Sequence, residues 1–219
     1  MIEIVIVGQN ESGYIEKMYR SLNPYSYRRV WILDRCTDDS DKQLQELGEY
    51  FVKTNNSLNG RQTSHARNLG LSASSKDSDV LFLDGDRFPA TGALYKLDMW
   101  DKDIALLMLE DDFRDNTRDF AGERYGRVNN DFYSCGIFIK RHAINKVLEF
   151  QSGELFSTEM QNDWGIEDTY LGDVCYHLGL TCDLYKDCRL RGRFDRLNLD
   201  SLDVLEKRFK KRERLNVKW

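Results

Sequence analysis

Short apolar runs alternate with amphipathic segments along the first part of the chain. The runs at residues 2–7 and 80–83 lack the period-two alternation of a strand with one wet face. The strands that this pattern predicts are residues 2–7, 29–33, 50–53 and 80–83. Apolar residues at helical spacing predict helices at residues 11–22, 38–47 and 63–73. Strands that alternate with helices indicate a mainly parallel sheet with crossover helices.

The second part of the chain is less regular. The strands predicted here are residues 104–109, 131–140 and 180–185, and the helices are residues 141–150, 167–178 and 202 onward. Segment 110–130 is polar and highly charged, which predicts a long loop of the kind that often contacts a substrate. The whole pattern predicts one α/β domain over residues 1–219, with a mixed, mainly parallel sheet flanked by helices.

Polar residues follow three of the predicted strands, at 8–11, 34–38 and 84–86. Ligands of such sheets bind beyond the carboxyl ends of the strands, so these segments are candidates for a site. Taken singly, each is also ordinary turn or helix-cap chemistry. Their occurrence together at one edge of the sheet favours a binding site.

The segment Asp84-Gly85-Asp86 is the most informative of the three. Two carboxylates one residue apart, on a turn that leaves a buried strand, can approach one hard cation. Mg²⁺ and Mn²⁺ prefer oxygen ligands and commonly bind one or two carboxylates together with substrate phosphates. The alternative is a plain Asp-Gly turn, because such triplets are common. The position directly after the strand at 80–83 favours the metal.

Net charge and charge distribution say little about which partner the protein binds. The formal net charge of -5 argues against non-specific binding to nucleic acid. Segment 189–218, however, is rich in Arg and Lys. It can contact a phosphate-bearing acceptor or a membrane surface, although a solvated helix face is the commoner meaning of a charge run.

The chain shows no features of a membrane or secreted protein. It has no apolar run near the ~20 residues that cross a bilayer, and its N-terminus reads as a strand rather than a signal peptide. The cysteines are scattered and odd in number, which favours reduced thiols. They are Cys36, Cys135, Cys175, Cys182 and Cys188. We therefore expect a cytoplasmic protein without a transmembrane segment.

Four motifs in order carry a resemblance to a known family. They are residues 4–11 with Asn10-Glu11, residues 32–40 with Asp34, the segment His65-Ala66-Arg67-Asn68-Leu69-Gly70, and residues 81–86. Each motif is weak, but their order and spacing resemble the family 2 glycosyltransferases with the GT-A fold. The resemblance implies a GT-A, Rossmann-like fold. Residues 1–100 would bind the nucleotide sugar, and residues 101–219, with a basic C-terminal helix, would bind the acceptor.

The resemblance also implies roles for single residues. The residues that it places at the nucleotide are Asn10, Glu11, Asp34, Arg67, Asp84 and Asp86. Asp34 would accept a hydrogen bond from uracil N3–H, and Arg67 would lie near the base or the diphosphate. Asp84 and Asp86 would hold Mn²⁺ or Mg²⁺, with Asp86 as the direct ligand. Without the resemblance, Asp34 is also a turn residue and Arg67 a surface ion pair on a helix.

A second acidic cluster precedes the helix predicted at 167–178. Trp164-Gly165-Ile166-Glu167-Asp168 is similar to the Trp-Gly-x-Glu-Asp segment of GT-A galactosyltransferases. The similarity implies that Asp168 is the catalytic base, with Glu167 beside it and Trp164 and Gly165 in contact with substrate. An acceptor hydroxyl needs such a carboxylate to remove its proton. The alternative is that the acids favour a helix N-terminus and Trp164 belongs to the core.

These features lead to one function with two alternatives. We expect metal-dependent transfer of a sugar from a UDP-sugar to an acceptor hydroxyl, with inversion. A nucleotidyltransferase is disfavoured because segment 8–13 lacks the basic residue of a phosphate loop. A non-catalytic nucleotide-sugar-binding module is disfavoured because both acidic pairs are present. The expected acceptor is a saccharide or a lipid-linked saccharide, with hydroxymethylated DNA as a second option.

Overall fold

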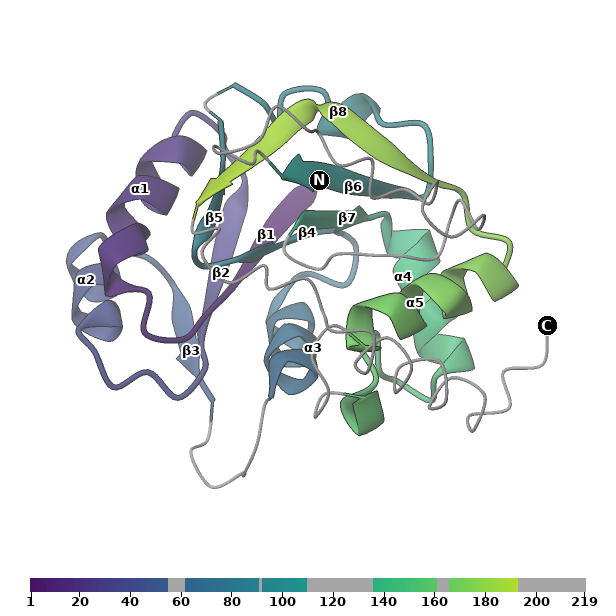
Figure 1. Cartoon of the computed structure of the whole chain (residues 1–219), viewed down its shortest axis with the longest axis horizontal. Helices are drawn as coiled ribbons and strands as arrows, with labels where there is room; N and C mark the ends of the chain where they lie inside the picture. Colours follow the sequence, from purple (N-terminus) through teal and green to yellow (C-terminus); the bar gives the residue numbers. More distant parts are fainter. Residues whose placement is uncertain (55–61, 91, 110–135, 161–165, 193–219) are drawn as a thin grey trace, which may run out of the picture.

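The computed structural model describes residues 1–54, 62–90, 92–109, 136–160 and 166–192. Within these residues the strands form an 8-stranded sheet (Figure 1). The strands are β1 (Ile2–Gly8), β2 (Arg28–Leu33), β3 (Phe51–Lys53), β4 (Asp79–Asp84), β5 (Arg87–Pro89), β6 (Ile104–Leu109), β7 (Gly136–Ile139) and β8 (Cys182–Gly192). The helices are α1 (Ser12–Leu22), α2 (Ser40–Glu46), α3 (Thr63–Ala73), α4 (Arg141–Phe150) and α5 (Ile166–His177), with 3-10 turns η1 (Leu97–Met99) and η2 (Thr158–Met160).

The sheet is mixed and mainly parallel, in the order β3-β2-β1-β4-β7-β6-β8-β5. Strand β1 runs parallel to both β2 and β4, and β3 runs parallel to β2. Strand β7 is antiparallel to β4 and β6, while β8 is parallel to β6 and antiparallel to β5. This arrangement confirms the predicted α/β fold class.

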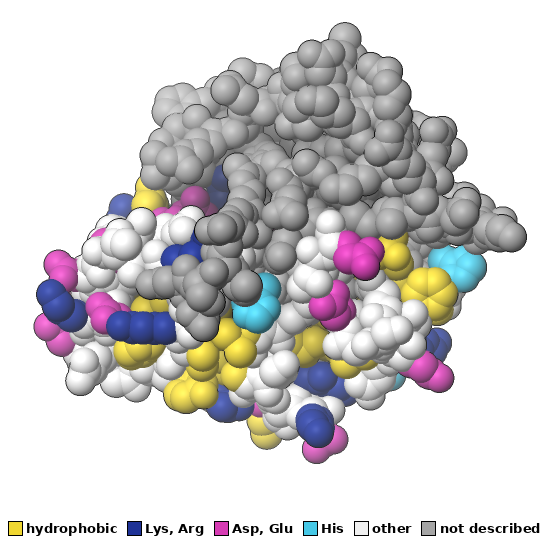
Figure 2. Space-filling view, turned by 90° about the horizontal axis from the view of Figure 1, so that it is seen from below, with side chains coloured by type: hydrophobic (Ala, Val, Ile, Leu, Met, Phe, Trp, Pro, Cys, Tyr) yellow, Lys and Arg dark blue, Asp and Glu magenta, His cyan; other side chains and the backbone are white. Residues whose placement is uncertain are grey.

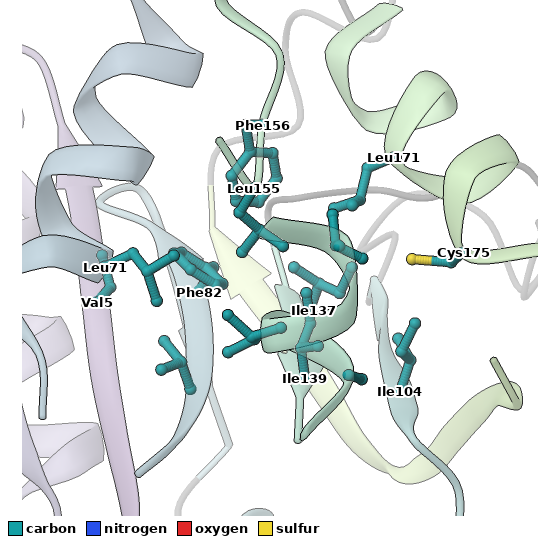
Figure 3. Packing of buried hydrophobic residues seen from close by; sticks show 14 of the residues in the cluster. Val5, Leu71, Phe82, Ile104, Ile137, Ile139, Leu155, Phe156, Leu171 and Cys175 are labelled. Carbon is teal, nitrogen blue, oxygen red and sulfur yellow. The ribbon is translucent and has the colours of Figure 1, made fainter. Parts of the chain in front are cut away.

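Helices cover both faces of the sheet. One apolar cluster joins the sheet to α3, α4 and α5, and Figure 3 shows its packing around Val5, Phe82 and Ile137. The other cluster joins the opposite face to α1 and α2. Both faces of the central strands are therefore buried, which explains why their sequences are continuous apolar runs.

The alternation of side chains along the strands decides where the acidic residues point. Val30 and Ile32 of β2, and Val80 and Phe82 of β4, belong to the cluster that packs on α3. Every second residue of a strand faces the same side, so Asp84 at the end of β4 and Asp34 directly after β2 face the same side as these residues. Both carboxylates therefore leave the sheet on the α3 face, at its carboxyl edge.

Helix α3 lies unusually close to the sheet at Gly70. A Cβ atom at Gly70 would lie 2.2 Å from Cγ1 of Val5 and 3.2 Å from Cγ1 of Ile32. Only glycine allows this approach without a shift of β1 or β2. The contact fixes the height of α3 on the sheet and so places Arg67, one turn earlier, at the carboxyl edge.

Most of the predicted elements are present with shifts of one or two residues at their ends. Of the predicted strand 131–140, residues 131–135 lie outside the described residues and Gly136–Ile139 form a strand, while the predicted strand 180–185 is longer, as Cys182–Gly192. Strand β5 was not predicted. The loop at 110–130 and the helix from 202 onward lie outside the described residues.

Two features bear on the expected class of protein. None of the helices in the described ranges has the length and hydrophobicity that crossing a membrane requires. Within the same ranges the cysteines are free thiols, and they are Cys36, Cys175, Cys182 and Cys188. Cys135 lies outside these ranges.

Candidate functional site

The loops after β1 and β2 are tied together at the carboxyl edge of the sheet. The backbone N–H of Asp34 donates to the Gly8 carbonyl at 2.8 Å, and the Thr37 N–H donates to Oδ1 of Asn10 at 2.7 Å. Asn10 has a left-handed backbone with φ 58°, which asparagine tolerates better than most residues. The structure therefore brings the predicted residues Asn10 and Asp34 to the same edge.

The loop after β1 also touches the acidic turn after β4. A Cβ atom at Gly85 would lie 3.1 Å from the Cα of Gly8 and 3.3 Å from Cγ of Glu11. The two glycines let the backbones meet, and Glu11 packs against them. The predicted residue Glu11 is thus placed beside the Asp84-Gly85-Asp86 turn.

Asp34 is already engaged within the protein. Its Oδ1 accepts from Nε of Arg35 at 3.1 Å and from Oγ1 of Thr54 at 2.8 Å, and its Oδ2 accepts from Nη2 of Arg35 at 3.0 Å. Arg35 has φ 52°, a left-handed conformation that is uncommon for arginine. A small cavity adjoins this pair and is lined by Leu33, Arg35, Cys36, Asp41, Lys53 and Thr54.

Arg67 is the centre of the largest charge cluster in the described chain. Its Nη2 lies 3.0 Å from Oδ1 of Asp84, and its Nη1 lies 3.3 Å from Oδ1 of Asp168 and 3.5 Å from Oε1 of Glu167. The side chain is 4% exposed and its guanidinium lies 5.3 Å from the Phe156 ring centroid, a cation–π arrangement. The first turn of α5 is thereby joined to the end of β4 through α3.

The cluster carries more negative than positive charge. Burial alone would lower the pKa of Arg67, but the surrounding carboxylates raise it above its ordinary value, so the guanidinium stays charged. Burial raises the pKa of Glu167 to about 7, with a further contribution from the charge of Asp168. Oε2 of Glu167 is buried without a hydrogen-bond partner. Near neutral pH the folded protein is therefore expected to bind a proton at Glu167.

The raised pKa of Glu167 predicts a pH dependence of stability. Between its ordinary pKa of 4.5 and about 7, the folded state holds more protons at this carboxyl than the unfolded state, so stability falls as pH rises through this window. We expect a loss of up to about 3 kcal/mol in the free energy of unfolding. Urea unfolding of the metal-free protein from pH 4.5 to 8 measures it.

A neutral residue at this position removes the effect. Glu167→Gln should be nearly flat over the same pH window and more stable than the unsubstituted protein at pH 8. Glu149→Gln, on the exposed side of α4, is the matched control and should keep the slope. Equal slopes in all three proteins would contradict the assignment of the pH dependence to Glu167.

Asp84 and Asp86 form the candidate metal centre. Their side chains are 34% and 24% exposed, and Oδ1 of Asp86 lies 3.7 Å from Nε of Arg87. Among the described residues, no group of three or more His, Cys, Asp or Glu side chains is arranged to hold a metal ion. A hard cation would therefore complete its shell with phosphate oxygens or water, which suits Mg²⁺ or Mn²⁺.

Strand β8 closes against the acidic turn, which the sequence did not predict. A Cβ atom at Gly192 would lie 1.8 Å from the carbonyl oxygen of Asp86, so only glycine fits here. The contact comes from the pairing of Arg87 with Gly192, the first register pair of β5 and β8. The turn that carries Asp86 is thus held by a strand whose contacting residue, Gly192, is more than a hundred residues away in the chain.

Asn68 and Phe156 were also missed as residues that support the site. Nδ2 of Asn68 donates to the Phe156 carbonyl at 2.7 Å, and its Oδ1 accepts from the Phe156 N–H at 3.0 Å. This clamp holds the Phe156 ring against Arg67. Asn68 could have been found from the sequence, because it directly follows Arg67 in the third motif. The predicted substrate residues Trp164 and Gly165 lie outside the described residues.

The arrangement of strands and helices is the GT-A fold, and its structural neighbours are glycosyltransferases with that fold. The sequence matches no protein-family model and no curated protein. S. aureus TarS matches 100% of this chain with a TM-score of 0.66 and 16% identity, but the match covers 40% of the TarS chain. The chain thus spans less than half the length of TarS.

A second neighbour is glucosyl-3-phosphoglycerate synthase from Mycobacterium tuberculosis. Its complex with Mn²⁺, UDP and phosphoglyceric acid matches 95% of this chain and 75% of its own, with a TM-score of 0.61 and 16% identity. Its complex with Mn²⁺, UDP-glucose and phosphoglyceric acid has a TM-score of 0.62, with 16% identity over 96% of this chain and 76% of its own. At such identities the likeness establishes the fold.

Proposed function

We propose that this chain is a metal-dependent glycosyltransferase that moves a sugar from a UDP-sugar to an acceptor hydroxyl. The observation that carries the proposal is the double engagement of Arg67. It binds Asp84 of the candidate metal centre with one nitrogen, and Glu167 and Asp168 with another. A donor bound at the first group would therefore lie next to a carboxylate able to take the acceptor proton. The Mn²⁺ and UDP-glucose complexes of a neighbour with this fold support the choice of donor.

The donor would lie over the carboxyl ends of β1, β2 and β4. Asp86 and Asp84 would hold Mn²⁺ or Mg²⁺, which offsets the charge of the diphosphate leaving group. Asn10 and Glu11 would line the nucleotide, with the base toward Asp34. This assigns residues 1–100 to the donor and residues 101–219 to the acceptor.

Asp168 is the better candidate for the catalytic base. Its neighbour Glu167 has a pKa of about 7 and is half protonated at neutral pH, while Asp168 is the more exposed of the two, at 13% against 7%. Asp168 would take the proton of the acceptor hydroxyl as it attacks the anomeric carbon, which gives a single displacement with inversion. Trp164 and Gly165 would contact the sugar, as in the family 2 and galactosyltransferase motif.

The proposed acceptor is a saccharide or lipid-linked saccharide, with DNA as the second option. Figure 2 shows that acidic, basic and apolar side chains are interspersed on the described part of one face. Binding to DNA depends on a continuous basic surface that neutralises several phosphates. The described residues of that face do not provide one.

Asp86→Ala tests the donor site. The UDP affinity measured by calorimetry with Mn²⁺ should fall at least about tenfold, because the cation loses a carboxylate ligand. Asp101→Ala is the matched control, since that side chain is 74% exposed and pairs with Lys102. Equal UDP affinity in both variants, or an unsubstituted protein without Mn²⁺-dependent UDP binding, would contradict the proposed function.

A further inference from the structure

Gln62 is a buried polar residue without a partner. It occupies the N-cap position of α3 without a side-chain capping hydrogen bond and is 1% exposed, and neither its side-chain nitrogen nor its side-chain oxygen has a hydrogen-bond partner. A buried primary amide that makes no hydrogen bond costs stability, and such groups in folded proteins call for an explanation. The Gln62 amide is therefore suited to a group that enters the site from outside the chain.

The geometry of α3 places the Gln62 amide at the carboxyl edge of the sheet, where the nucleotide is proposed to bind. Gln62, Ala66 and Gly70 are spaced by four residues, so they share one face, and Gly70 shows that this face lies on β1 and β2. The Ala66 N–H donates to the Gln62 carbonyl at 2.8 Å, so the first backbone hydrogen bond of the helix ends at Gln62. Gln62 lies about 12 Å along the axis before Gly70, beyond the carboxyl ends of the two strands. Asp34 leaves the sheet at the same edge and on the same face.

The residues expected to bind the base are occupied by other protein groups. Asp34 accepts three hydrogen bonds from Arg35 and Thr54. Arg67 is held by carboxylates on two sides. Gln62 differs from both, since neither atom of its side-chain amide has a hydrogen-bond partner in the protein. An amide also matches a uracil edge, because its N–H can donate to a ring carbonyl while its oxygen accepts from N3–H.

We propose that the side-chain amide of Gln62 binds the uracil of the donor nucleotide through N3–H and a neighbouring carbonyl oxygen. The proposal rests on the proposed function, because it names the base-binding residue of the same donor site. It gives the amide the partners that it lacks in the protein. The stability that the amide costs is then recovered when the nucleotide binds.

Gln62→Leu tests the proposal with two measurements that must move in opposite directions. UDP affinity in the presence of Mn²⁺, measured by calorimetry, should fall about tenfold or more, because a two-bond contact to the base is lost. The thermal midpoint without nucleotide should rise by about 2–4 °C, because a buried amide without a partner is replaced by an apolar group. Gln45→Leu, on the exposed side of α2, should change neither value by comparable amounts.

A negative charge at position 62 should change which nucleotide base the protein prefers. In Gln62→Glu the ratio of UDP to CDP affinity should fall, because a carboxylate has no donor for a uracil carbonyl but accepts from the cytosine amino group. If Gln62→Leu binds UDP as the unsubstituted protein does, or lowers the thermal midpoint, Gln62 is a structural residue and the proposal is overturned. An unsubstituted protein that binds no nucleoside diphosphate overturns the proposed function as well, so the two failures are distinguishable.

Discussion

Asp168→Asn should lower the kcat of sugar transfer by about 10²- to 10⁴-fold, the usual contribution of a general base. The amide keeps the size of the side chain but cannot accept the acceptor proton. Asp84 and Asp86 are unchanged, so the KM for the UDP-sugar and the affinity for UDP should stay within about threefold of the unsubstituted values. A loss in kcat alone would separate a role in the chemical step from a role in donor binding.

Two variants make this result interpretable. Asp187→Asn is the matched control, because that residue pairs with Lys96 at the surface and is 54% exposed. Glu167→Gln tests the neighbour, and its effect on kcat should be much smaller because Glu167 is buried and half protonated at neutral pH. A kcat that falls more in Glu167→Gln than in Asp168→Asn would assign the base to Glu167 instead.

The residues at the carboxyl edge of the sheet were predictable, because the local pattern of apolar and polar residues shows where each strand ends. Uninterrupted apolar runs mark strands covered on both faces, and the residues after such strands must lie at one edge. That reasoning located Asn10, Asp34 and Asp84 correctly on the fold. It needs only the parity of side chains along a strand and the direction of the crossover connections.

The partners of these residues were not predictable, because they depend on contacts between distant segments. Arg67 was expected at the base or the diphosphate, yet its Nη1 binds Asp168, 101 residues further along the chain. Asp34 was expected to accept a hydrogen bond from uracil N3–H, and no pattern in the sequence indicated that Arg35 and Thr54 also donate to it. Periodicity gives the face of an element but not the length or direction of a charged side chain.

Strand β5 and the second half of β8 were missed for a related reason. Strand β8 extends to Gly192 through a charged sequence, and its pairing with β6 shifts register between Leu107 and Met108. Strand β5 has only three residues, Arg87–Pro89, and exists through its pairing with β8. Strand β5 has neither an apolar run nor a strict alternation, so its pairing with β8 and not its own sequence makes it a strand.

Arg67→Met should destabilise the fold by about 3–5 kcal/mol, the cost of removing one partner from a buried ionic cluster. Methionine keeps the apolar contact with the Phe156 ring but leaves three carboxylates without their cation. Urea unfolding measures the loss. Arg20→Met is the matched control, because its pair with Glu16 is 75% and 67% exposed and should contribute little.

The double variant Arg67→Met with Glu167→Gln identifies the physical cause. If repulsion between carboxylates is what destabilises Arg67→Met, Glu167→Gln should stabilise the Arg67→Met protein at pH 8 by more than it stabilises the unsubstituted protein at the same pH. Simple loss of side-chain packing would give additive effects, with equal stabilisation by Glu167→Gln in the two backgrounds at each pH. Recovery of stability without recovery of sugar transfer would show that Arg67 also holds Asp84 and Asp168 in the geometry that the reaction needs.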